Sequence, residues 1–128
     1  MPSTKYARTQ GPKLNTENRQ LLKTILEAID NKKGIDVKTL HVGELVSYTD
    51  YLVLCTGASD PQVKALADFV EEKVKLQNSV RPLLSYKDPN WLILDYIDIV
   101  VHIFRPETRA YYDLDTLWED APRVEIRI

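Results

Sequence analysis

The chain has 128 residues, enough for one domain with a buried core and too few for two domains of ordinary size. Its formal net charge is −2, but residues 1–16 carry three basic residues and no acid, so removing this +3 leaves −5 for the remainder. An acidic body is poorly suited to bare RNA or DNA and better suited to a basic protein partner. Because no apolar run approaches the roughly 20 residues that span a bilayer, we expect a soluble, unsecreted protein without a membrane partner.

The first segment, residues 1–15, contains two prolines and a glycine and shows no apolar period. This composition predicts a disordered tail. Its basic residues could contact RNA once the protein is bound to a partner. The simpler interpretation is a flexible terminus or the remnant of an organelle-targeting segment.

A helix and a strand are predicted next. Asn15 or Thr16 can cap a helix whose apolar residues fall on one face from Leu21 to Ile29, and Gly34 is expected to end it. Residues 35–40 alternate apolar and polar side chains as a strand does, and a short turn or helical piece follows.

Residues 51–55 are almost continuously apolar, which predicts a second, central strand. Cys55, the only cysteine, lies inside this run. No internal disulfide can form, so we expect a buried thiol in a reducing compartment, either the cytoplasm or an organelle interior.

The loop 56–60 leads into a helix, for which Asp60 is the expected N-cap and Pro61 the first helical residue. The helix should dock on the sheet through an apolar face and end at Asn78 and Ser79. A strand, a small-residue loop and a helix N-terminus can bind phosphate. We favour a structural loop here, because Asp60 would occupy the donors that a phosphate needs.

Three more strands are predicted at 81–86, 91–95 and 98–104, with a turn at 87–90. One straight strand across 91–104 would span roughly 46 Å, too long for this domain, so the chain must turn near 95–98. Pro106 opens a last helical stretch. The pattern predicts a single α/β domain with a mixed, roughly five-stranded sheet packed by helices.

Polar residues interrupt the apolar run 91–104 at Asp95, Asp98 and His102, which are the best catalytic or metal candidates by residue type. Asp98 and His102 provide only a pair on one strand face, and His41 is distant in sequence. We therefore favour hydrogen-bonded structural groups and expect no catalytic residue, metal or cofactor.

Aromatic residues are concentrated near the end of the predicted sheet, at Trp91, Tyr111, Tyr112 and Trp118. Such clusters are more often core than interface, yet Tyr and Trp are also the residues most enriched in binding hot spots. Both interpretations stay open for this set.

Several ordered motifs resemble the Iojap/RsfS family of ribosomal silencing factors. They are Asp50-Tyr-Leu-Val-Leu-Cys-Thr-Gly-Ala-Ser-Asp60 followed by Gln-Val-Lys-Ala-Leu-Ala, then Trp-Leu-Ile-Leu-Asp-Tyr, Asp-Ile-Val-Val-His-Ile-Phe, and Tyr-Tyr-Asp-Leu ending in Leu117-Trp118. The resemblance spans roughly Leu21 to Trp118 and does not cover the tail. One departure is Ile97, where the family usually has Gly, since a β-branched residue disfavours the positive φ of a tight turn.

The resemblance implies a nucleotidyltransferase-like topology for residues 16–118, with 119–128 as a C-terminal tail that could add an edge strand. It implies a non-enzymatic silencing factor that binds the large ribosomal subunit through ribosomal protein L-fourteen and blocks small-subunit joining. Peripheral ribosomal RNA contact by the basic N-terminal tail, and a homodimer when free, are further expected partners. The alternatives are a large-subunit assembly factor without silencing and a small nucleotidyltransferase-like enzyme. The expected location is the cytoplasm, or alternatively the mitochondrial matrix or chloroplast stroma.

The motif residues that could reach the surface and bind the partner are Trp91, Asp95, Tyr96, Asp98, Tyr111 and Tyr112. Trp91 and Asp95 are the strongest candidates, because even spacing on one strand places a ring and a carboxylate on the same face.

Overall fold

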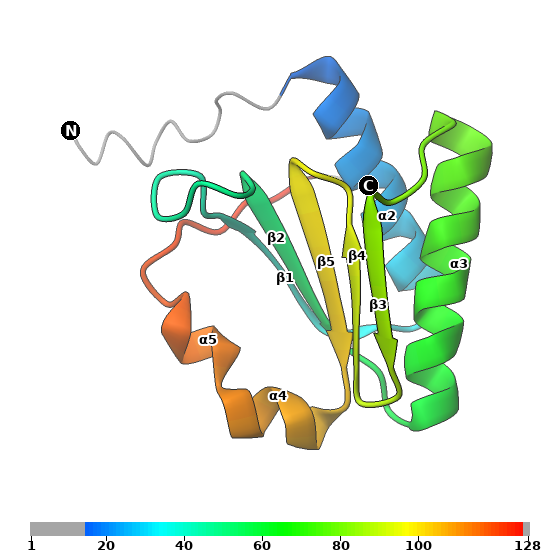
Figure 1. Ribbon diagram of the computed structural model, residues 1–128, viewed down its shortest axis with the longest axis vertical. Coiled ribbons are helices and arrows are strands. Elements are labelled where there is room, and N and C mark those ends of the chain that lie inside the picture. The colour runs from blue at the N-terminus through cyan, green and yellow to red at the C-terminus, as the bar shows by residue number, and fades with distance from the viewer. Residues whose placement is uncertain (1–14, 127–128) are drawn as a thin grey trace.

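The computed structural model describes residues 15–126, so the predicted disordered tail lies outside the described residues except for Asn15. The chain folds as one α/β domain with a five-stranded mixed sheet in the order β1-β2-β5-β4-β3 (Figure 1). The elements are α2 (Thr16–Asn31), β1 (Ile35–His41), β2 (Tyr51–Thr56), α3 (Asp60–Asn78), β3 (Leu84–Asp88), β4 (Trp91–Asp95), β5 (Ile99–Phe104), α4 (Pro106–Tyr112) and α5 (Leu114–Leu117). The predicted fold class is confirmed.

The sheet is mixed because its connections differ in length. β4 and β5 are joined by a short turn and pair antiparallel, whereas β2 reaches its parallel neighbour β5 only after α3 and two further strands. Every residue of β2 is buried, as its continuous apolar sequence predicts, and β2 lies between β1 and β5.

The two faces of the sheet are covered unequally (Figure 1). On one face α2 and α3 bury a large core that includes Ile25, Leu66 and Ile103. On the other face Leu114 and Trp118 pack against a smaller cluster that includes Leu52. This second layer is short, so part of the sheet near β3 and β4 has no helix over it.

Helix starts follow the capping rules, with one correction. Of the two predicted candidates, Asn15 and Thr16, Asn15 is the N-cap of α2, since its side chain accepts from Asn18 N at 2.8 Å. The N-cap of α3 is Ser59 rather than Asp60: Ser59 has an extended backbone and accepts from Gln62 N at 3.3 Å. Asp60 is already helical, and its carboxylate pairs with Arg105 at 2.5 Å.

The end of α2 also differs from the prediction. The left-handed residue is Lys33, with φ of 62°, rather than Gly34. Gly34 is required for space, because a Cβ at that position would collide with the Ile29 side chain and with Cys55 Sγ. Cys55 is a free, buried thiol, as predicted, and burial raises its pKa to about 12.

The third strand runs over 84–88 instead of the predicted 81–86. The two-residue turn Pro89-Asn90 pairs Asp88 with Trp91, so strand pairing continues to Asp88 and fixes the register from that end. Proline at position 82 has no N–H to donate, which disfavours an earlier start.

The C-terminal segment meets the free edge of β1. His41 N donates to Pro122 O at 2.9 Å, Val124 N donates to Thr39 O at 2.8 Å, and Leu40 forms an isolated antiparallel bridge with Arg123. The last two residues of the expected edge strand, 127 and 128, lie outside the described residues. Within 15–126 no helix is long and apolar enough to cross a membrane.

Candidate functional site

The uncovered part of the sheet exposes one set of side chains from β3, β4 and β5. Cross-strand pairing places Leu84 opposite Asp95, and both Tyr86 and His102 opposite Ile93, which puts these five on the same face. Leu84 is 62% exposed and Tyr86 54%. With Trp91 and Tyr112 they form a surface that we call the open face.

Aromatic rings gather at one end of the open face, where α4 meets β4. The Trp91 ring centroid lies 5.0 Å from Tyr112 and 5.6 Å from Phe104. Tyr111 and Tyr112 pack edge to face at 5.0 Å, and Tyr111 is 81% exposed. The structure thus brings three predicted site residues together, with Trp91 partly buried as an anchor and the tyrosines outside it. Trp118, like Trp91, packs against the smaller core cluster.

His102 supports Trp91 from the neighbouring strand. Trp91 Nε1 donates to His102 Nδ1 at 3.0 Å, which requires Nδ1 to be unprotonated. Burial lowers the pKa of His102 to about 4, and this outweighs the opposing effect of Asp95. His102 is therefore neutral at pH 7 and orients the indole.

The predicted acidic residues serve the turn between β4 and β5. Asp95 Oδ1 accepts from Ile97 N at 2.7 Å, and Asp98 Oδ2 accepts from Asn18 Nδ2 at 3.2 Å. Asp95 lies on the open face as predicted, four residues and roughly 13 Å along β4 from Trp91. A ring and a carboxylate therefore share one surface.

Tyr96 is not on the surface as expected. Alternation along β4 turns Trp91, Ile93 and Asp95 outward, so the next residue points to the α2 and α3 side. Tyr96 is only 5% exposed and belongs to the large core cluster. Its ring cannot contact a partner on the open face.

Ile97 adopts the conformation that its side chain disfavours, with φ of 75°. Asp98 N donates to Tyr96 O at 2.9 Å, which closes a γ-turn around Ile97, and Tyr96 N donates to Ile99 O at 2.8 Å. The Asp95 carboxylate compensates by binding Ile97 N. The chain keeps a tight turn here without glycine.

A buried arginine fixes the helix that carries the two tyrosines. Arg109 is 7% exposed and donates two hydrogen bonds to the Asp115 carboxylate, from Nε at 2.8 Å and from an amino group at 2.9 Å. It also donates to Thr56 Oγ1 and to Asp36 O, both at 2.8 Å. Hydrogen bonds from Arg109, opposed by partial burial and assisted by Lys38, hold the pKa of Asp115 well below its usual range.

The two other kinds of site considered from the sequence are a phosphate site in the loop 56–60 and a metal site. In the loop 56–60, a Cβ on Gly57 would approach Val63 atoms to 2.7 Å, so the loop packs tightly against α3. Within residues 15–126 no group of three or more His, Cys, Asp or Glu side chains could hold a metal.

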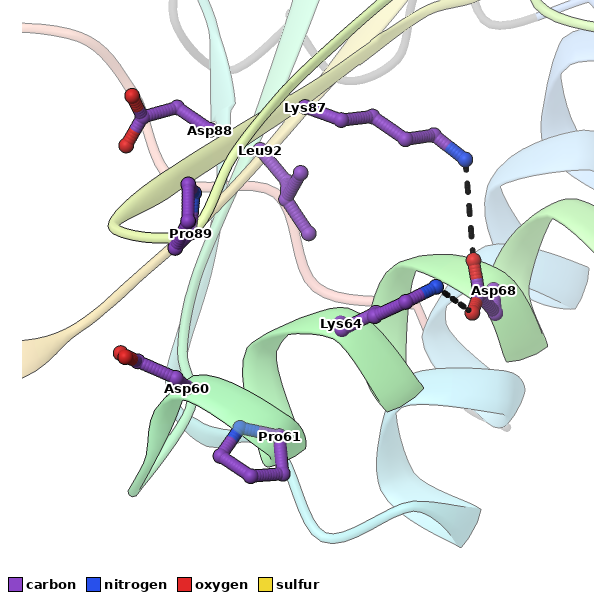
Figure 2. Close-up of a pocket in the computed structure, with 8 residues that line it drawn as sticks. All are labelled: Asp60, Pro61, Lys64, Asp68, Lys87, Asp88, Pro89 and Leu92. Carbon is purple, nitrogen blue, oxygen red and sulfur yellow. Dashed lines mark hydrogen bonds and ion pairs between the residues drawn. The ribbon is translucent and has the colours of Figure 1, made fainter.

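The pocket in Figure 2, about 320 Å³, lies between α3 and the β3–β4 turn over Leu92. Its two lysines are already paired: Lys64 contacts Asp68 at 2.9 Å, and Lys87 contacts Asp68 at 3.7 Å and Glu71 at 3.1 Å. Two further carboxylates of the lining also have partners, since Asp60 pairs with Arg105 and Asp88 Oδ1 accepts from Asn90 N at 2.9 Å.

Sequence reasoning missed Leu84, Tyr86 and Ile93 as part of the open face. The alternation from Leu84 to Tyr86 was visible, but it could not show that no helix covers this edge of the sheet. It also missed Arg109, whose buried guanidinium donates hydrogen bonds to Asp36 and Thr56, which are far away in the chain.

A family model described as "Ribosomal silencing factor during starvation" matches residues 15–128. The match includes residues 119–128, which the motif resemblance did not cover. The ribosomal silencing factor RsfS of Halalkalibacterium halodurans is 36% identical over 110 residues, which covers 85% of this chain and 94% of that protein. Its length therefore matches this chain closely.

A crystal structure of a Chromobacterium violaceum protein superimposes with a TM-score of 0.74 at 35% identity, covering 78% of this chain and 84% of that one. A mouse protein named "Mitochondrial assembly of ribosomal large subunit protein 1" is 30% identical over 98 residues. These residues make up 73% of this chain and 43% of the mouse protein.

Proposed function

Because this chain belongs to the RsfS family of ribosomal silencing factors, whose members are regulatory proteins and not enzymes, we propose that it silences ribosomes by binding the large subunit and blocking small-subunit joining. The mechanism is steric, since one protein surface occupies another and no reaction is needed. The nucleotidyltransferase-like alternative is not retained. The observation that supports docking is the open face, where the exposed Tyr112 packs on the half-buried Trp91 and the exposed Tyr111 packs on Tyr112.

The proposed partner on the large subunit is ribosomal protein L-fourteen. Binding energy concentrates in a few Trp, Tyr and Arg anchors surrounded by weaker contacts. Trp91, Tyr111 and Tyr112 have this arrangement, and Asp95 places a carboxylate at the other end of the same face. A basic protein surface complements this acidic body.

Asp98 and the segment 1–14 have secondary roles in this proposal. Asp98 stabilises the turn next to Asp95 through Asn18. The basic residues of 1–14, outside the described part of the chain, supply a peripheral contact to ribosomal RNA. A homodimer through the open face would shield its exposed Leu84 and Tyr86 when no ribosome is bound.

A second candidate is assembly of the large subunit without silencing, which the name of the mouse relative favours. The proposed location is the cytoplasm, and the mitochondrial matrix or chloroplast stroma is the alternative that suits an assembly role.

Sedimentation of the purified protein with isolated subunits tests the proposal. We expect it to migrate with large subunits and not with small ones, and to lower the yield of joined ribosomes when both subunits are present. Binding to large subunits without any effect on joining would favour the assembly role. Binding to small subunits alone would reject both.

A further inference from the structure

A second concave site lies at the end of the sheet that carries the β4–β5 turn. This pocket, about 410 Å³, is enclosed by the first turns of α2, the last turn of α3 and the turn itself. Figure 1 shows the start of α2 and the end of α3 at the same end of the domain. The lining residues are Glu17, Asn18, Gln20, Leu21, Gln77, Asn78, Val80 and Tyr96. Its volume lies in the range of small-ligand sites.

Two buried polar atoms of this lining have no hydrogen-bond partner within the described residues. They are the hydroxyl of Tyr96, on a side chain that is 95% buried, and Oδ1 of Asn78. An unpaired polar atom in a protein interior costs free energy, and nearly all such atoms are satisfied in native proteins. An ordered water or an atom of a ligand would supply the missing partner for these atoms.

The two unpaired oxygen atoms of the lining can each accept a hydrogen bond from a ligand. Asn78 Oδ1 can only accept, and a phenol oxygen can accept as well. Asn18 donates one amide hydrogen to Asp98, and its carbonyl oxygen can accept a further hydrogen bond. Burial, assisted by Glu71, raises the pKa of Tyr96, so the phenol stays neutral.

The charge of the pocket lining further restricts the class of ligand that the pocket can bind. Glu17 is the charged member of the lining, which contains no Lys, Arg or His among the described residues. The last turn of α3 adds the partial negative charge of a helix C-terminus, and the first turn of α2 adds the opposing partial positive charge of an N-terminus, so the full charge of Glu17 sets the sign of the site. An anionic ligand would be repelled and a cation attracted. A planar guanidinium, which has five donors and no acceptor, suits this set of acceptors better than a carboxylate or a phosphate.

We propose that this pocket receives the guanidinium group of an arginine side chain that the basic ribosomal partner presents. The inference rests on the proposed function for the source of the arginine. Its location supports that source, because Tyr96 belongs to the turn that Asp95 stabilises at one end of the open face. The pocket lies on the α2–α3 side of the sheet, so a partner that covers Asp95 on the open face reaches it only by extending an arginine side chain around the β4–β5 turn.

The first experiment titrates the full chain with N-acetyl-arginine amide, followed by ¹H–¹⁵N NMR. The matched ligand is N-acetyl-citrulline amide, which has the same shape without the charge. We expect saturable shifts at Asn78 and Tyr96, with a Kd on the order of 1 mM for so small a ligand, and binding of the citrulline compound at least roughly tenfold weaker. Absence of saturable shifts would mean that the pocket holds only water, and would overturn the inference.

The second experiment measures large-subunit affinity of Tyr96→Phe and Glu17→Gln. The control is Glu72→Gln, which removes an exposed carboxylate of α3 outside the pocket. Loss of one hydrogen bond or one charge should weaken both arginine-amide and subunit binding roughly fivefold, while the control stays at the wild-type value. Melting curves establish that each variant is folded.

The outcomes separate this inference from the proposed function. If the wild type binds large subunits and the two variants bind equally well, the inference is wrong and the proposed function stands. If the amide binds but subunit affinity is unchanged in the variants, the pocket takes a free ligand and the assignment to the partner fails. If the wild type does not bind large subunits, both proposals fail.

Discussion

The indole Nε1 of Trp91 donates a hydrogen bond of 3.0 Å to Nδ1 of His102, joining β4 to β5 on the open face. This contact holds the imidazole in the neutral form with its proton on Nε2, and it fixes the orientation of the largest ring on that face. His102, one of three residues that by type were candidates for catalysis or metal binding, thus supports a binding anchor.

The first prediction is that stability depends on pH through His102. Its folded pKa, about 4, lies below the ordinary 6.5, so the unfolded chain binds more protons between these values. The contribution of neutral His102 to the free energy of unfolding is fully present above pH 7. It declines as the pH falls from 6.5 to 4, by on the order of 3 kcal/mol in total. Urea unfolding of wild type and His102→Asn at pH 7, 5.5 and 4.5 measures it. At pH 7 His102→Asn should be less stable than the wild type, and its free energy of unfolding should fall less between pH 7 and 4.5. An equal fall in both proteins would contradict the lowered pKa of His102.

The second prediction is that Ile97→Gly stabilises the protein. A left-handed conformation costs a non-glycine residue about 1–2 kcal/mol, and glycine gives back part of this in unfolded-chain entropy. A net gain of about 0.5–1 kcal/mol should appear in urea unfolding. Ile35→Gly is the matched control, since Ile35 is similarly exposed but lacks a positive φ, and it should destabilise. A loss of stability in Ile97→Gly would mean that the isoleucine side chain stabilises the turn in another way.

The third prediction concerns the support of α4. Arg109→Lys retains the positive charge but loses the bidentate hydrogen bonding to Asp115, and it should destabilise the protein by about 3 kcal/mol. Arg81→Ala, at an exposed position, should change stability by less than about 0.5 kcal/mol. Because the pKa of Asp115 is lowered in the folded state, its contribution is present above about pH 4 and is lost as the pH falls further. Equal stability of Arg109→Lys and wild type would show that the pair is dispensable.

Much of the fold follows from local rules in the sequence. The limit on strand length places a turn between Trp91 and Phe104, and the Asn15 side chain marks the start of α2. The register of β3 does not follow, because it is set by pairing across the Pro89-Asn90 turn. The choice of Ser59 over Asp60 as N-cap depends on Arg105, which is distant in sequence and captures Asp60.

The candidate site was predictable only in part. Period-two alternation places Trp91 and Asp95 on one face, and the same rule, applied one residue further, assigns Tyr96 to the interior. Contact of Trp91 with Tyr112 depends on where α4 packs, which Arg109 determines through long-range contacts. Tertiary contacts of this kind leave no periodic pattern in the sequence.

The fourth prediction separates the charge of Asp95 from its structural role. Asp95→Asn keeps an oxygen for Ile97 N and removes the charge, whereas Asp95→Ala loses both and Asp95→Lys adds repulsion against a basic partner. Large-subunit affinity should fall in the order wild type, Asn, Lys. Asp95→Ala should also melt earlier than Asp95→Asn, because it loses the hydrogen bond of the turn. If Asp95→Lys binds as tightly as the wild type, Asp95 lies outside the interface.

The most direct test of the central claim is a subunit-joining assay with purified subunits, in which light scattering follows the joining reaction as protein is added. Wild type should block joining. Trp91→Ala should require on the order of thirtyfold more protein, as truncation of a true anchor costs about 2 kcal/mol or more. Leu76→Ala, which removes an exposed side chain of α3 on the other side of the sheet, should act as wild type. A folded Trp91→Ala that blocks joining at wild-type concentrations would contradict docking through the open face.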